Sequence, residues 1–162
     1  MAFGSMSFLF GFLPAVLLCY FLCPTRWRTA RNGVLLVFSL VFYCWGGVRL
    51  LPAFAVSCVG NWAAALLVSP GRRHRKAVYA AAVVLNLLML GYYKYTGFLL
   101  GNLAALGMDV TVPSIALPAG ISFFTFQAVA YLTDVYRGTI PAERNLGRVT
   151  LFMAFFPQLL QG

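Results

Sequence analysis

Acidic residues are scarce in this chain of 162 residues, which has three Asp and Glu side chains against twelve Lys and Arg. Charged residues of both signs make up only 9% of the sequence, while 62% of it is hydrophobic. A soluble domain has about 25% charged residues, because its exterior must be polar. The scarcity of charge therefore excludes an ordinary soluble protein and indicates surfaces that face lipid or other membrane helices.

Residues that carry common enzyme chemistry are scarce as well. His74 is the only histidine, and it lies in a basic turn with no nucleophile beside it, so we do not expect it to act as a catalytic base. The sequence contains no glycine-rich phosphate loop and no metal-ligand cluster, so it predicts no metal site. The cysteines lack a CxxC pair and lie in or beside apolar runs, which favours apolar packing over disulfides; they are Cys19, Cys23, Cys44 and Cys58.

The basic residues form short clusters between long apolar runs, which argues against a nucleic-acid partner. A helix needs roughly 20 apolar residues to cross the hydrocarbon core. The run 33–68 is too long for one span, and Gly46, Gly47 and Pro52 mark a turn within it. The predicted spans are 3–23, two within 33–68, 77–100 and 117–136. We therefore predict an all-α polytopic protein with about five spans and a truncated sixth apolar segment, with 1–162 as one transmembrane part.

The basic clusters also predict an orientation. Three Lys or Arg lie between the first two spans, four between the third and fourth, and three after the fifth, leaving only Arg49 and Lys94 elsewhere. Positively charged connections stay in the cytoplasm. The first apolar run lacks both a preceding basic region and a cleavage site, so it is a retained span. We expect a multi-pass protein of the bacterial inner membrane with its N-terminus outside and the segment 101–116 on the outer face.

The predicted span 117–136 carries polar side chains on one stripe. At about 100° per residue, Tyr131 and Asp134 fall within about 40° of Gln127, as do two glycines, Gly120 and Gly138. Such a stripe either lines a pathway for substrate or packs helices together through hydrogen bonds, and the spacing leaves both readings open.

Two further groups are predicted at the membrane interfaces. Asp134 and Arg137 are three residues apart at the cytoplasmic end of this span, where a structural ion pair is available. Lys94 lies among three tyrosines, which favours interfacial anchoring by a snorkelling lysine over substrate contact; they are Tyr92, Tyr93 and Tyr95.

Five stretches resemble a known family: SMSFLFGFLP, FYCWGG, LGYYKYTGFLL, LPAGISFFTFQAVAYLTDVYRG and FFPQLLQG. Together, and in this order along nearly the whole chain, they are similar to the membrane-bound O-acyltransferases, in the branch of the alginate O-acetylation protein. The resemblance implies an enzyme that moves acetyl groups from a cytoplasmic thioester, acetyl-coenzyme A or a carrier-linked acyl thioester, to hydroxyls of an exported polysaccharide such as alginate.

In that family the helices form a ring around a funnel, and a histidine on a later helix is taken as the catalytic base. The resemblance therefore implies that this chain is an N-terminal part without a catalytic residue, inactive alone, with no cofactor bound. The expected partners are the lipid bilayer, the remaining C-terminal helices, and periplasmic acetyltransferase partners or the polysaccharide acceptor. The residues expected to line or brace the pathway are Gln127, Tyr131, Asp134 and Arg137, with Pro157 and Gln158 at its cytoplasmic mouth.

Two other functions fit the same composition. A transport or channel module would use the polar stripe, although broken-helix repeats are not evident in the sequence. A non-enzymatic membrane subunit would need no catalytic residue at all. We expect acetyl transfer only from a longer chain that supplies a base.

Overall fold

The computed structural model describes residues 6–24, 26–47, 51–71, 73–106, 120–155 and 157. A π-helical turn, η1 (Phe8–Phe12), leads into α1 (Leu13–Leu22), and five more helices follow: α2 (Arg28–Gly47), α3 (Leu51–Val68), α4 (Arg75–Ala105), α5 (Ile121–Arg137) and α6 (Leu146–Ala154). Over the described residues there are helices and no strands, which confirms the predicted all-α class.

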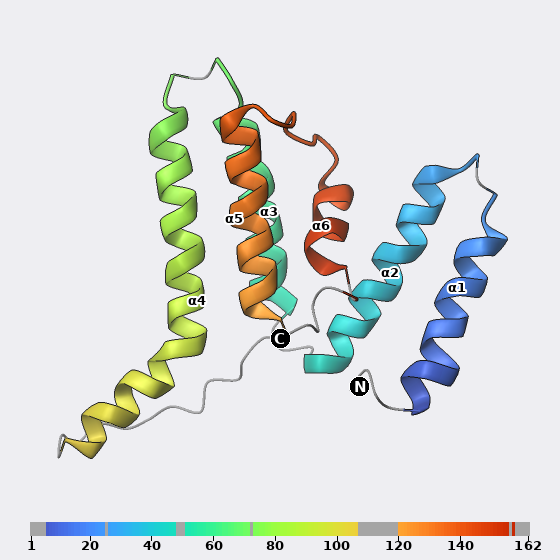
Figure 1. The fold of residues 1–162 in the computed structure, drawn as a ribbon, viewed down its shortest axis with the longest axis horizontal. Helices are drawn as coiled ribbons and strands as arrows, with labels where there is room; N and C mark the ends of the chain where they lie inside the picture. Colours follow the sequence, from blue (N-terminus) through green and yellow to red (C-terminus); the bar gives the residue numbers. More distant parts are fainter. Residues whose placement is uncertain are drawn as a thin grey trace.

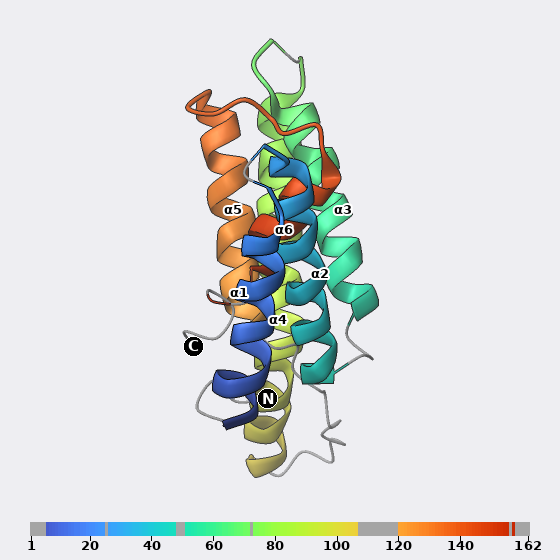
Figure 2. The same cartoon turned by 90° about the vertical axis from the view of Figure 1, so that its right-hand side faces the viewer.

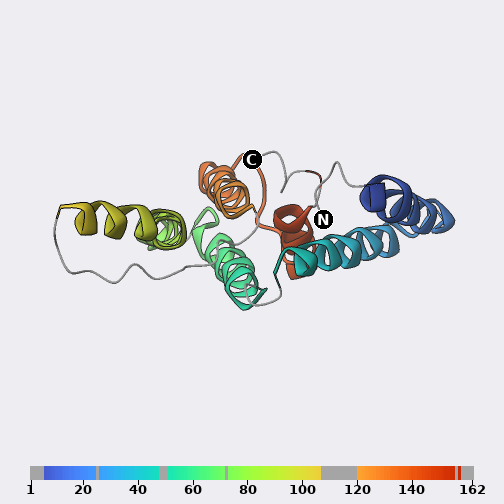
Figure 3. The same cartoon turned by 90° about the horizontal axis from the view of Figure 1, so that it is seen from below.

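The helices run alternately up and down, so that the connections α1–α2, α3–α4 and α5–α6 all lie at one end of the molecule (Figure 1). These three connections carry the basic clusters, so we call the end of the molecule where they lie the basic end. Figure 2 shows that the helices lie roughly parallel to a common axis, which is vertical in Figures 1 and 2. Seen along that axis, α1 lies at one edge and α4 at the other, with α3, α5 and α6 between α4 and α2 (Figure 3).

Local sequence signals set several helix boundaries. Helix α2 ends at Gly47 and α3 begins at Leu51, so both bounds fall at the predicted turn. At the end of α5, Gly138 has a φ of 79°, and the Gly138 and Thr139 amides donate to the carbonyls of Val135 and Asp134. This is a Schellman cap, which glycine favours because it has no Cβ to strain the left-handed conformation. Helix α4 continues to Ala105, so the predicted loop from residue 101 begins too early.

Two helical stretches are long and apolar enough to cross a membrane, Leu51–Val68 and Arg75–Asn102, and the stretch Phe10–Leu22 is apolar but shorter. Helix α5, with 17 residues, is shorter than either stretch, and α2 begins with arginines in its first turn. The count of about five spans therefore stays a prediction. Large apolar side chains are nevertheless exposed along all three of these apolar stretches, among them Leu18, Val56 and Leu88, as expected of lipid-facing surfaces.

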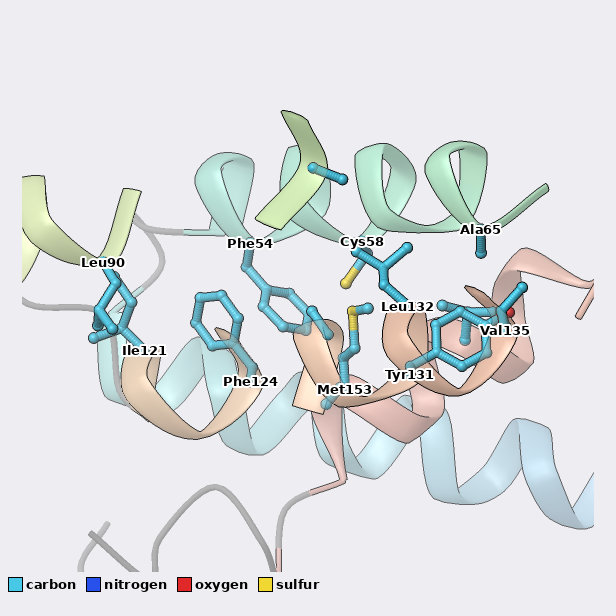
Figure 4. Close-up of a cluster of buried hydrophobic side chains, with 14 of the residues drawn as sticks. Phe54, Cys58, Ala65, Leu90, Ile121, Phe124, Tyr131, Leu132, Val135 and Met153 are labelled. Atoms are coloured by element: carbon cyan, nitrogen blue, oxygen red, sulfur yellow. The ribbon is translucent and has the colours of Figure 1, made fainter. Parts of the chain in front are cut away.

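The main core forms around α5, which packs against α3, α4 and α6. Phe124 and Leu132 of α5 are buried, as are Phe54 of α3 and Met153 of α6, and their side chains meet between the helices (Figure 4). The rings of Phe54 and Phe124 pack edge to face with centroids 5.2 Å apart. A second cluster, Phe8, Val16 and Phe42, joins α1 to α2. The core therefore holds α5, the helix with the polar stripe, at the centre of the described helices.

Candidate functional site

The polar stripe of α5 divides between the interior and the surface. Tyr131 is buried, and its hydroxyl accepts a 2.9 Å hydrogen bond from the Glu143 amide. Gln127 is partly buried, whereas Asp134 and Arg137 are exposed. Only part of the stripe is therefore covered by the described helices, and its end at Asp134 and Arg137 is exposed. Tyr131 instead ties α5 to the connection that leads to α6.

The ion pair that the spacing allows between Asp134 and Arg137 is not formed. Within the described residues, the one salt bridge joins Arg148 Nη1 to Glu143 Oε2 at 3.2 Å. Glu143 Oε1 also accepts a hydrogen bond from the Asn145 amide. The bonds from Asn145 and Arg148 lower the pKa of Glu143 below its ordinary value. The acidic group at the basic end that has a defined ionic partner is thus Glu143, which the sequence did not single out.

The residues predicted at the pathway mouth and at the outer interface are only partly described. Pro157 is partly buried beyond the end of α6, and Gln158 lies outside the described residues. Lys94 Nζ donates to Ser122 Oγ at 3.2 Å, which joins α4 to the first turn of α5. Tyr93 packs against the main core, while Tyr92 and Tyr95 are exposed. Lys94 therefore has a helix-bridging contact that sequence reasoning did not predict.

A second polar contact between α4 and α5 lies at the basic end. The rings of Tyr79 and Tyr136 stack with centroids 4.6 Å apart, and the Arg75 guanidinium lies 4.7 Å from the Tyr136 ring centroid. Arg75 also donates to the Tyr136 carbonyl. The Tyr79 and Thr133 hydroxyls are 2.9 Å apart. The spacing along each helix would have grouped these residues, but sequence reasoning could not pair the two helices.

A buried pair of side-chain amides joins α3 to α4. Asn61 Nδ2 donates to Asn86 Oδ1 at 3.1 Å, and Asn86 Nδ2 donates to Asn61 Oδ1 at 2.7 Å. Each amide also donates to a carbonyl one turn earlier, Asn61 to Ser57 and Asn86 to Ala82. The feature of the sequence that could have indicated this contact is a single Asn inside each of two apolar runs. The pair lies beside an open groove of about 490 Å³ between α3 and α4.

These polar groups join neighbouring helices and the α5–α6 connection. His74 is exposed, and in the described part of the chain no three His, Cys, Asp or Glu side chains gather as metal ligands. Acyl transfer to a hydroxyl needs a base to take its proton and a site that excludes water. The polar contacts described between α4 and α5 join the two helices.

Comparison with known proteins gives relatives along the whole chain. No protein-family model matches, and no solved structure matches. The chain is 41% identical over 170 residues to a probable alginate O-acetylase AlgI of Azotobacter vinelandii, covering 100% of this chain and 34% of that protein. It is 42% identical over 170 residues to the probable alginate O-acetylase AlgI of Pseudomonas aeruginosa, covering 100% of this chain and 32% of the relative.

A more distant relative carries a different name. The peptidoglycan O-acetyltransferase of Helicobacter pylori is 30% identical over 192 residues, covering 99% of this chain and 36% of that protein. The chain thus spans about a third of the length of the curated relatives it matches. Because identity near 40% extends from end to end, the chain belongs to the membrane-bound O-acyltransferase family, in the branch of the alginate O-acetylases.

Proposed function

We propose that this chain is the N-terminal transmembrane part of a bacterial inner-membrane O-acetyltransferase. The whole protein moves acetyl groups from a cytoplasmic thioester, acetyl-coenzyme A or a carrier-linked acyl thioester, to hydroxyls of an exported polysaccharide such as alginate. The observation that carries the proposal is the similarity over the entire chain to proteins named alginate O-acetylase. The name of the Helicobacter relative supports acetyl transfer to a polysaccharide more broadly.

The proposed orientation puts the basic end in the cytoplasm and the N-terminus outside. Its support is the alternation of the helices, which brings three basic connections to one end. Cytoplasmic connections of membrane proteins carry an excess of Lys and Arg. A thioester donor with phosphate groups would approach that end, where positive charge raises the local concentration of anions.

The residues of this chain serve as walls and braces of the proposed acyl pathway. Tyr131 holds the α5–α6 connection at the basic end, and the exposed Asp134 and Arg137 lie one and two turns further along α5. Gln127 lies one turn deeper on the same helix. Pro157 follows the end of α6 that points away from the basic end, so we propose that it braces the pathway further from its cytoplasmic mouth. Gln158, outside the described residues, keeps its proposed place at the mouth only as a prediction from the sequence. The base that takes the hydroxyl proton comes from the rest of the protein, together with periplasmic partners that present the acceptor.

An acetylation assay on the whole gene product tests the function. The protein is produced in a bacterium whose own polysaccharide O-acetylase is deleted, and ester-linked acetyl is measured on the secreted polysaccharide. We expect the unsubstituted protein to restore acetylation. Secreted polysaccharide without acetyl, despite normal amounts of the protein in the membrane, would contradict the proposal.

A pair of matched variants tests the proposed wall. Asp134→Asn should reduce acetylation at least about tenfold at unchanged membrane abundance, because a loss of about 1.4 kcal/mol in transition-state stabilisation has that effect. The control, Glu143→Gln, removes an acid at the same end whose partner is Arg148, and should acetylate near the wild-type level. If Asp134→Asn acetylates at the wild-type level, Asp134 does not contribute to the proposed acyl pathway.

Cysteine labelling tests the orientation. In a protein whose native cysteines are replaced by alanine, a cysteine at Thr139 reports on the α5–α6 connection, and one at Tyr92 reports on the opposite half of α4. A membrane-impermeant reagent added to the periplasmic side should leave the Thr139 position unlabelled and should label it in inverted vesicles. Labelling of Thr139→Cys from the periplasm would reverse the proposed topology.

A further inference from the structure

A polar pocket lies at the basic end, between the last turns of α1 and the first turns of α2. Four side chains line it, Tyr20, Arg28, Arg31 and Asn32, and its volume is about 430 Å³. The Arg31 guanidinium lies 4.7 Å from the Tyr20 ring centroid, and its Nε donates to the Cys23 carbonyl at 3.0 Å. These two contacts orient Arg31, so the pocket contains a positioned guanidinium beside a second one.

The positive charge of this pocket is not neutralised by any acid in the described part of the chain. Asp134 and Glu143 belong to α5 and the α5–α6 connection, and Glu143 pairs with Arg148. Helix α2 begins at Arg28, so the positive end of its dipole adds to the two guanidiniums. The pocket therefore attracts an anion, and paired guanidiniums suit the oxygens of a phosphate.

The surroundings of the pocket indicate where that phosphate comes from. Helix α1 lies at the edge of the helix array and packs on α2 (Figures 1 and 3). The same two helices expose large apolar side chains: Phe21, next to Tyr20 in the last turn of α1, is 71% exposed, and further from the basic end Leu18 is 64% exposed and Val37 58%. A ligand that fills the pocket and also covers this surface has a phosphate at one end and an apolar chain at the other.

We propose that the α1–α2 pocket binds the headgroup phosphate of an anionic phospholipid, such as phosphatidylglycerol, whose acyl chains lie along the exposed faces of α1 and α2. This inference rests on the membrane placement and orientation proposed above. A soluble phosphate compound would meet the same guanidiniums, but it would leave the adjoining apolar surface uncovered. The lipid fits both parts of the surface.

The test measures lipid retention on the whole gene product, purified in detergent, by native mass spectrometry with phosphatidylglycerol or phosphatidylcholine added. We expect clear preference for phosphatidylglycerol. Arg28→Gln should lower its retention about fivefold, because one basic side chain near an anionic lipid surface contributes about 1 kcal/mol. Arg28 makes no hydrogen bond or ion pair among the described residues, so this variant should fold.

Arg26→Gln is the matched control, because Arg26 is exposed in the same connection but does not line the pocket. It should keep near wild-type retention, and phosphatidylcholine retention should be equal in all three proteins. Arg31→Lys keeps the charge but loses the planar group over Tyr20, and should also lower retention of phosphatidylglycerol.

Three results would contradict lipid binding in the α1–α2 pocket. They are equal retention of the two lipids, equal losses from Arg28→Gln and Arg26→Gln, and displacement of phosphatidylglycerol by millimolar coenzyme A, which would assign the site to a soluble phosphate compound. These results leave the proposed enzyme intact if acetylation persists. Recovery of the protein from cells in a soluble, detergent-free form would instead contradict the membrane placement on which both proposals depend.

Discussion

The reciprocal amide pair between α3 and α4 allows the sharpest stability prediction. Asn61 is 4% exposed and Asn86 6%, and two hydrogen bonds join their side chains. Asn86→Leu removes both bonds while keeping a side chain of similar size. It also leaves the Asn61 carbonyl oxygen without the donor that the described structure gives it, in an environment with little water.

The expected loss of stability follows from the free energies of buried hydrogen bonds in other proteins. A buried polar group left without a partner costs about 1–3 kcal/mol in soluble proteins. Hydrogen bonds between membrane helices average about 0.6 kcal/mol each and reach about 1.7 kcal/mol. For two bonds we expect Asn86→Leu to lower the free energy of unfolding by about 1–2 kcal/mol. The double variant Asn61→Leu with Asn86→Leu should cost clearly less than the sum of the single variants, because it leaves neither amide unpaired.

The assay is a double-mutant cycle on the whole gene product, with reversible unfolding followed in mixed micelles. The predicted coupling between the two positions is about 1–2 kcal/mol. As a control, Asn86→Leu combined with Gly97→Ala, further along α4, should be additive within about 0.5 kcal/mol. A coupling near zero for the asparagine pair would refute the reasoning, because it would mean that the two amides do not support each other in the folded protein.

Three further changes test other parts of the fold. Gly138→Ala should lower the free energy of unfolding by about 1 kcal/mol, because a side chain with a Cβ is strained at a φ of 79°. Gly97→Ala in α4 should raise it by up to about 1 kcal/mol, because the added Cβ meets no atom within 4 Å. Similar shifts of the melting temperature for the two variants would contradict the glycine cap. Folding lowers the pKa of Glu143, so the ionised side chain contributes to stability above its ordinary pKa of 4.5, and this contribution is lost as the pH falls below that value. The melting temperature of Glu143→Gln should therefore depend less on pH between about 3 and about 7. The same pH profile for the variant and the unsubstituted protein would rule out this contribution. Tyr43→Phe removes a buried hydroxyl that has no hydrogen-bond partner within the described residues, so stability should stay equal or rise by up to about 1 kcal/mol; a loss larger than that would show that the hydroxyl has a partner.

Helix positions could be predicted where the signal is local. The glycines at 46 and 47 with Pro52 marked the break between α2 and α3, and Gly138 marked the end of α5, because these residues limit backbone conformation by themselves. The end of α4 was predicted too early, since an isolated glycine, Gly101, does not stop a helix in apolar surroundings. Charge counts predicted which connections share an end, because alternating spans leave no other arrangement.

Side-chain partners could not be predicted in the same way. Periodicity put Tyr131 and Asp134 on one stripe, but only tertiary packing decides that Tyr131 is buried while Asp134 is exposed. The Asn61–Asn86 pair depends on the register between two antiparallel helices, which no pattern within either helix specifies. The proposed function rests on the similarity to proteins named alginate O-acetylase, and not on a group of catalytic side chains in this chain.

The length of α4 has a consequence for the membrane around it. Its 31 residues extend over about 46 Å, whereas the hydrocarbon core of a bilayer is about 30 Å thick. Figure 1 shows that the helix bends away from its neighbours in its second half. An upright α4 would carry about three turns beyond the acyl chains, where Phe98 and Leu99, which are 66% and 59% exposed, would meet water. In the proposed membrane placement, the bend would instead lay the end of α4 obliquely along the headgroup layer, as an interfacial segment.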